Sequence, residues 1–231
     1  MSHAKWIAAA ALCTPFATWA ASLCDRVPVR AASAQVVGED MIANGLPMTV
    51  VAVQFDESPA RVANAFHDYW KRDGIVALEL TGPRGTTLSA YDGVCQYVVE
   101  IPVGQQRDRT HAVASAMRFD KSGVRHTLSA DDAVLPGGNV LSDVESRDPL
   151  QVGRTWVIEL GGMPDDGAMQ YGDELRRHGW KVVAAAAAPE FGGSDSNGYA
   201  LAVQKGKRQI DAVFSDRSGR TTAVINLVEV R

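Results

Sequence analysis

The sequence lacks an excess of positive charge. Its 231 residues include 23 lysines and arginines against 27 aspartates and glutamates, and the formal net charge is −4. This balance gives no electrostatic reason to expect nucleic acid or an anionic membrane surface as a partner. The composition is otherwise that of an ordinary globular protein, with 46% apolar and 22% charged residues.

Motifs for catalysis and cofactor binding are also missing. The sequence has no G-x-S-x-G, no H-E-x-x-H, no P-loop and no dinucleotide-binding glycine pattern. The stretch GGSDS at 192–196 lacks a strand before it and a helix after it, so we expect a flexible loop there. We therefore predict no catalytic residue, no cofactor and no metal site, and a protein that is not an enzyme.

The N-terminal residues form an apolar run that follows a positive charge. Lys5 precedes an apolar core at 6–13, and small residues at Thr18 and Ala20 suit cleavage after Ala20. The core is too short to span a bilayer and Pro15 interrupts it, so 1–20 is predicted to be a secretory signal peptide. A buried N-terminal helix and a lipoprotein are the alternatives. We expect a protein in the periplasm or outside the cell, without a transmembrane segment in the mature chain.

Cysteine is scarce, with three residues in the chain. Cleavage after Ala20 removes Cys13 and leaves Cys24 and Cys95. An even pair in an oxidising compartment favours one disulfide, which would attach an N-terminal arm at 21–46 to the structure that follows. Two free buried thiols are the alternative.

Two stretches, 48–74 and 153–179, follow one pattern. Each has an alternating strand, a turn, a helix that begins at a proline and a terminating glycine. The distance from Pro59 to Gly74 equals that from Pro164 to Gly179, and RT-x-AV recurs at 109–113 and 220–224. We therefore predict an α+β fold of two tandem β-α-β-β-β modules, each a mainly antiparallel sheet with one packed helix.

The predicted organisation has five segments. A first module spans 47–129 and a second spans 153–231, after the signal peptide and the arm. Residues 130–152 lose periodicity and contain Pro136 and Pro149, so they are predicted to be a linker. The alanine run and the glycines within 184–198 predict a loop. The pattern leaves open whether the two modules share one continuous sheet.

Candidate binding residues lie in the second module. Trp156 and Tyr199 would line a ligand groove or interface, although tryptophans at such periodic positions are more often core residues. Lys205, Lys207 and Arg208 form a basic hairpin tip that could contact an acidic partner, or simply a solvated turn. His111 and His126 fall in neighbouring predicted strands and could serve a hydrolase or a metal pair, but surface histidines are commoner there.

Each module has a strand, a helix that begins at a proline and a hairpin sheet, and the second helix ends near Gly179. This pattern is similar to small α+β modules of bacterial cell-envelope, pilus and secretion-system accessory proteins. The resemblance covers both modules and transfers no residues. It implies an exported, non-enzymatic protein-binding or assembly component of the envelope, with envelope or secretion-system proteins as partners. A periplasmic binder of small ligands, an inhibitor or immunity protein, and a hydrolase are the other hypotheses.

Overall fold

Strands make up most of the molecule. The computed structural model describes residues 24, 29–119, 126–189, 197–217 and 219–231. The strands of the N-terminal half are β1 (Ser33–Ala43), β2 (Leu46–Phe55), β3 (Ala77–Gly82), β4 (Gly85–Tyr91), β5 (Cys95–Pro102) and β6 (Thr110–Arg118). Those of the C-terminal half are β7 (Asn139–Arg147), β8 (Gln151–Leu160), β9 (Lys181–Pro189), β10 (Asn197–Lys205), β11 (Arg208–Arg217) and β12 (Arg220–Val230).

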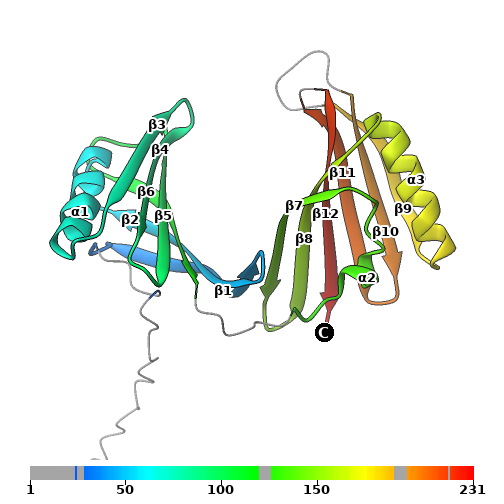
Figure 1. Ribbon diagram of the computed structural model, residues 1–231, viewed down its shortest axis with the longest axis horizontal. Coiled ribbons are helices and arrows are strands. Elements are labelled where there is room, and N and C mark those ends of the chain that lie inside the picture. Colours follow the sequence, from blue (N-terminus) through cyan, green and yellow to red (C-terminus); the bar gives the residue numbers. More distant parts are fainter. Residues whose placement is uncertain (1–23, 25–28, 120–125, 190–196, 218) are drawn as a thin grey trace, which may run out of the picture.

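All twelve strands belong to one antiparallel sheet, in the order β3-β4-β5-β6-β2-β1-β7-β8-β12-β11-β10-β9 (Figure 1). The prediction of two separate β-α-β-β-β modules, each with its own packed helix, is therefore wrong. Two strands rather than one precede each long helix and four follow it. The additional strands β1 and β7 pair with each other, 41–43 with 146–144, which merges the halves into one sheet.

Two long helices pack against the sheet and contribute part of the hydrophobic core. α1 (Pro59–Arg72) begins at a proline after Ser58, whose side chain accepts the Arg61 N–H, and α3 (Pro164–Arg177) also begins at a proline. The buried stripe of α1 includes Phe66 and that of α3 includes Tyr171. A short helix, α2 (Ala130–Ala133), precedes β7. In the described ranges, no helix is long and apolar enough to cross a membrane.

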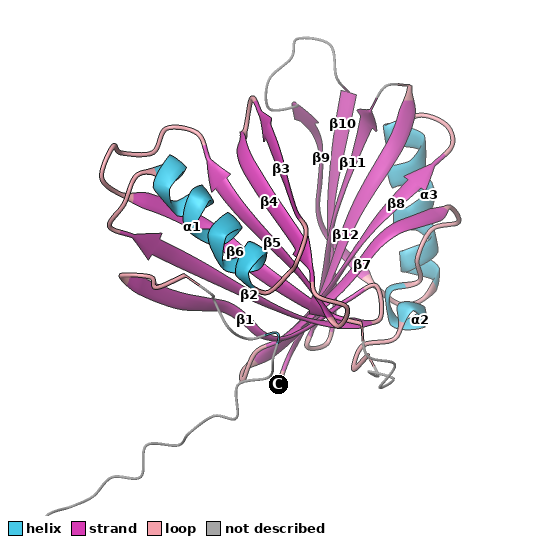
Figure 2. Ribbon diagram, turned by 60° about the vertical axis from the view of Figure 1, so that its left-hand side comes forward, coloured by secondary structure: helices cyan, strands magenta, loops and turns pink. Residues whose placement is uncertain are grey.

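Both long helices pack on the same face of the sheet. Ile42 in β1 lies opposite Pro47 in β2 and opposite Glu145 in β7, and Glu145 lies opposite Arg154 in β8. Paired residues on neighbouring strands share a face of the sheet, and so do alternate residues along one strand. These pairs therefore show that the face covered by α1 is the same face that α3 covers. Figure 1 shows the helices on the outside of the bent sheet. No described helix covers the opposite face, on the inside of the bend (Figure 2).

Several local expectations also change. Within 130–152, predicted to be an aperiodic linker, lie α2 and all of β7. The alanines expected in a loop at 184–198 belong largely to β9, which extends to Pro189. β3 was not predicted at all. The signal peptide at 1–20 and the stretch 192–196 fall outside the described residues, so their predictions stay predictions.

The predicted disulfide is present. Cys24 and Cys95 are bonded, with Cα atoms 5.6 Å apart, and both residues are buried. Cys95 is the first residue of β5, so the bond fixes the N-terminal arm to the sheet 71 positions further along the chain.

Candidate binding site on the uncovered face of the sheet

The face of the sheet opposite the helices is made mainly of small apolar and hydroxyl side chains. Alternation sends Ile158 and Ile225 to the helix face and their neighbours Val157 and Val224 to the other. Val113, Val213 and Val224 on this uncovered face are each at least 40% exposed. A wide and weakly charged surface of this kind is unusual for a face turned only to water, and it identifies the first region to search for binding.

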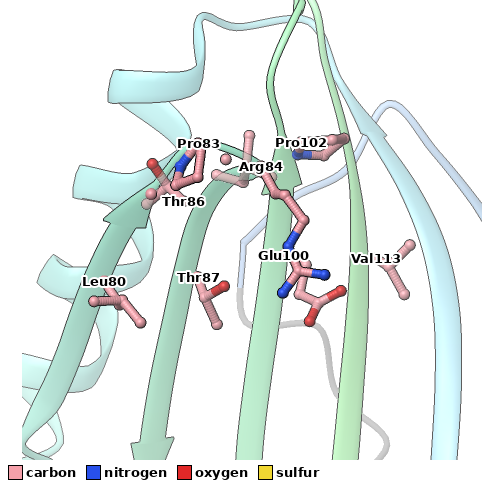
Figure 3. Close-up of a pocket in the computed structure, with 11 residues that line it drawn as sticks. Leu80, Pro83, Arg84, Thr86, Thr87, Glu100, Pro102 and Val113 are labelled. Atoms are coloured by element: carbon pink, nitrogen blue, oxygen red, sulfur yellow. The ribbon is translucent and has the colours of Figure 1, made fainter. Parts of the chain in front are cut away.

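A hollow of about 560 Å³ lies on this face over the N-terminal half. The strand register aligns Leu80, Thr87, Glu100 and Val113 in one row across β3, β4, β5 and β6. Figure 3 shows these side chains projecting into the hollow, with the Arg84 guanidinium extending from the β3–β4 turn toward the Glu100 carboxylate. The hollow therefore combines an apolar end of the row, a hydroxyl group, the Glu100 carboxylate and the Arg84 guanidinium.

Gly85 makes the top of this hollow possible. It stands at the start of β4 with φ +140°, a backbone conformation that side chains disfavour. A Cβ there would lie 2.1 Å from the Ile101 carbonyl oxygen. Only glycine therefore lets the β3–β4 hairpin approach β5 this closely, which places Arg84 over the sheet.

A second hollow of about 450 Å³ continues the first across β6, β2 and β1. The two share Pro102 and Val113. The row extends by register from Val113 to Ala52 and on to Gln35. His111 also lines this second hollow, and its backbone N–H is bound by the Gln105 side chain at 2.7 Å. Together the two hollows form a shallow groove over six neighbouring strands, which we call the transverse groove.

A buried ionic cluster lies on the opposite, helix-bearing face, next to the β1–β7 pair. The Glu145 carboxylate is fully buried and accepts the backbone N–H groups of Thr127 and Leu128 and the Nε–H of Arg147 at 2.7–3.0 Å. Burial alone would raise the pKa of Glu145, but these hydrogen bonds to its charged form outweigh burial and lower the pKa. Glu145 therefore stays ionised inside the protein.

Arg154 completes this cluster. It donates Nε–H and Nη2–H to the two carboxylate oxygens of Asp143 at 2.8 and 2.5 Å, and another N–H to the Leu128 carbonyl oxygen. Its guanidinium also lies over the Trp156 ring, 4.9 Å from the centroid. These contacts attach 126–129 and the following α2 to the sheet, which is a structural role.

The two candidate histidines are not brought together. His111 belongs to β6 and lines the transverse groove, whereas His126 precedes α2, 3.6 Å from Glu145 and 3.9 Å from Asp143. β2 and β1 separate β6 from β7, next to which His126 lies. Ser129, close to His126 in sequence, caps α2.

The candidate binding residues of the C-terminal half occupy different places. Trp156 is 1% exposed and belongs to the core beneath α3, and Tyr199 packs partly buried against the same core. Lys205 donates to the His178 carbonyl oxygen at 2.8 Å, Lys207 is exposed, and Arg208 binds Asp132 and Glu229. Trp156 thus lines no groove, and a contact of the hairpin tip with an acidic partner stays a prediction.

No residue of the transverse groove was predicted from the sequence. The strongest available signal was the Gly82–Pro83–Arg84–Gly85 turn, which marks a hairpin and hence a strand before it. Register across six strands cannot be obtained from such a local signal.

The described residues hold no group of three or more His, Cys, Asp or Glu side chains that could bind a metal ion. Comparison of the chain with known protein families, with curated proteins and with solved structures found no match.

Proposed function

We propose that the protein is an exported, non-enzymatic binding protein of the bacterial cell envelope, and that it holds an extended segment of a partner protein in the transverse groove. The observation that carries the proposal is the row from Leu80 to Gln35 on a sheet face that no described helix covers. Envelope proteins, including components of secretion or pilus systems, are the proposed partners.

The dimensions of the groove suit an extended segment. Neighbouring strands lie about 4.8 Å apart, so the row from β3 to β1 is roughly 24 Å long. An extended peptide of about seven residues has this length. Leu80 at the β3 end of the row and Val113 and Ala52 in its middle are apolar, whereas Thr87, Glu100 and Gln35 are polar. Interfaces between proteins commonly combine apolar and polar groups in this way.

Export is supported by the disulfide and by the predicted signal peptide. The Cys24–Cys95 bond attaches the segment directly after the proposed cleavage site to β5. Disulfides persist in oxidising compartments such as the periplasm and the cell exterior. Mass spectrometry of the exported chain tests this part: a start near Ala21 supports it, and an uncleaved chain with free thiols contradicts it.

The experiment for the groove uses a photoreactive amino acid incorporated in living cells. Replacement of Thr87 places the probe in the row, and replacement of Thr222, a half-buried threonine on the same face of the C-terminal half, is the matched control. We expect a discrete protein adduct from the Thr87 position and none from Thr222. A Val113→Arg change in the groove should remove the adduct. Equal adducts from both positions, or none from Thr87, would contradict the proposal.

A small-ligand binder is the second candidate. The volume of the first hollow, about 560 Å³, lies within the 300–1,000 Å³ that ligand pockets commonly have. The same experiment separates the two functions, because an adduct of a few hundred daltons would indicate a small molecule. A protein adduct would favour the leading proposal.

A further inference from the structure

We propose that the β3 edge of the sheet is a dimerisation site, at which β3 of a second copy of this chain pairs antiparallel with it. The proposal goes beyond the transverse groove and does not depend on it. It follows from a comparison of the two strands that end the sheet, β3 and β9.

The β9 edge carries protective features that β3 lacks. Its pairing with β10 is irregular between Ala202 and Val203, where the β9 partners skip from Ala184 to Val182, so Val183 is a bulge. The strand also begins with Lys181. Bulges and lysines are common means by which proteins prevent edge strands from pairing with other chains. β3 contains no lysine, and its register with β4 is regular over all 6 residues.

Large apolar side chains are unusually exposed along β3. Leu78 and Leu80 are 71% and 74% exposed on the uncovered face of the sheet, and Val76 just before the strand is 79% exposed. Glu79 points to the other face, where its carboxylate is 2.9 Å from His67 Nε2 of α1. The edge therefore presents an apolar side on one face and a hydrogen-bonded Glu79–His67 pair on the other.

The backbone of β3 also has groups directed outward. The Asp92 N–H donates to the Cys95 carbonyl oxygen, so even-numbered residues of β4 direct their backbone groups toward β5. Odd-numbered residues of β4 then face even-numbered residues of β3. Ala77, Glu79 and Thr81 are consequently left with N–H and C=O groups that point away from the sheet, ready to bind another strand.

The sequence of the strand favours another copy as that partner. Leu78-Glu79-Leu80 reads the same in both directions, so antiparallel self-pairing centred on Glu79 sets Leu78 of one copy against Leu80 of the other. Such leucine pairs fall at the closely spaced, non-hydrogen-bonded positions. Repulsion between the two opposed Glu79 carboxylates opposes this self-pairing, although each carboxylate has the His67 of its own copy as a partner.

The chain already uses this mode of association internally. Its two halves are joined edge to edge by antiparallel pairing of β1 with β7, through three residue pairs between 41–43 and 144–146. A β3–β3 junction centred on Glu79 would pair residues 77–81 of one copy with 81–77 of the other.

The primary test is the molar mass of the exported chain in solution, measured by sedimentation and light scattering over a concentration series. We expect a dimer that dissociates on dilution, and Leu78→Lys should raise its dissociation constant at least tenfold. Val183→Lys, the same type of change at an exposed site on the β9 edge, should leave it unchanged. Glu79→Gln should lower it severalfold, because the opposed charges are removed. Circular dichroism checks that each variant is folded.

The register is tested by disulfide cross-linking in a Cys13→Ser background. Only the central residue of the pairing meets its own copy, and hydrogen-bonded antiparallel pairs have Cα atoms about 5.5 Å apart, within the range of a disulfide. Glu79→Cys should therefore form a covalent dimer on oxidation, and Thr81→Cys should not. A wild-type chain that stays monomeric at about 100 µM, a concentration at which a Kd near 10 µM would give mostly dimer, overturns the proposal. A dimer that survives Leu78→Lys or that cross-links at Thr81 also overturns it.

Discussion

Replacement of Glu145 by glutamine tests the structural role assigned to the ionic cluster. The Glu145 carboxylate is 0% exposed and receives hydrogen bonds from the backbone of Thr127 and Leu128 and from Arg147. Glutamine has nearly the same shape but is neutral, and one of its two terminal atoms is an NH₂ donor. That NH₂ would face a group that also donates, and Arg147 would lose a charged acceptor.

The expected cost is the sum of two effects. Hydrogen bonds to a charged group contribute about 1.5–3 kcal/mol each, and a buried donor left without an acceptor costs about 1–3 kcal/mol. Breaking a buried ion pair by removal of one charge costs about 3–5 kcal/mol in measured cases. We therefore expect Glu145→Gln to lower the free energy of unfolding by roughly 3–5 kcal/mol.

Two measurements check this value. Urea denaturation gives the loss of unfolding free energy, and hydrogen exchange should show the Thr127 and Leu128 amides exchanging about 10²–10³ times faster in the variant. Glu159→Gln is the matched control, because Glu159 pairs with the exposed Arg220 and an exposed pair contributes only about 0–1 kcal/mol. A loss below about 1 kcal/mol for Glu145→Gln, or unchanged exchange at both amides, would refute the assigned role.

Three further predictions follow from other parts of the molecule. Cys95→Ser should lower the unfolding free energy by about 4 kcal/mol in urea titrations, from the loop-closure entropy of a 71-residue separation, and a reductant should add no further loss. Burial would raise the pKa of Asp92, but hydrogen bonds from the backbone N–H groups of Cys95 and Val94 and from the Tyr97 hydroxyl lower this pKa below 3.8. The ionised Asp92 therefore stabilises the fold fully above pH 3.8, and this stabilisation is lost as the pH falls through the folded-state pKa. Asp92→Asn should reduce the loss of stability at acid pH in a titration of unfolding free energy against pH. Gly85→Ala should destabilise the protein by more than about 2 kcal/mol in thermal melts, because of strain and the Ile101 contact, whereas Gly82→Ala, with no atom within 4 Å of its Cβ, should change stability little.

Local patterns in the sequence were sufficient for part of the fold. The proline that begins each long helix, the glycine after it and the apolar stripe with Phe66 are determined within about fifteen residues, and both helices were predicted correctly. The turn at Asp92–Gly93 between β4 and β5 is equally local. The disulfide followed from counting cysteines in an oxidising compartment, and the structure confirms it.

Buried charge explains why β7 was missed. Asp143, Glu145 and Arg147 on its helix-bearing side are charged, so this part of the strand lacks the apolar alternation that identifies a strand in sequence. Arg154, which pairs with Asp143, lies in the next strand and was not associated with it. A strand was expected at 180–183, but its continuation through the alanine run was missed for a different reason: alanine has a low intrinsic preference for strands, and pairing with β10 decides the structure there.

The transverse groove and the joining of the halves were beyond sequence reasoning because both depend on pairing between distant strands. Thr87, Glu100 and Val113 become neighbours only when two registers, of β4 with β5 and of β5 with β6, are set together. Periodicity shows which side of a strand is apolar, but it does not show which strands pair or which face a helix leaves uncovered. The edge strand β3 is short, and its exposed Leu78 and Leu80 resemble the apolar residues of a core.

The pairing of β1 with β7 has a consequence for how the chain folds. Asn44 and Asp143, which bind each other there through backbone and side chain, are 99 positions apart, whereas the hairpins of each half are local. Local contacts form earlier than distant ones, so this seam is expected to close late, and until then both strands are exposed to other chains in the same compartment. Before the seam closes, the open edges carry the charged side chains of Asp40, Glu145 and Arg147, which bind across or beside the seam in the folded protein. They would act as gatekeepers against aggregation during folding, before they contribute to the finished sheet.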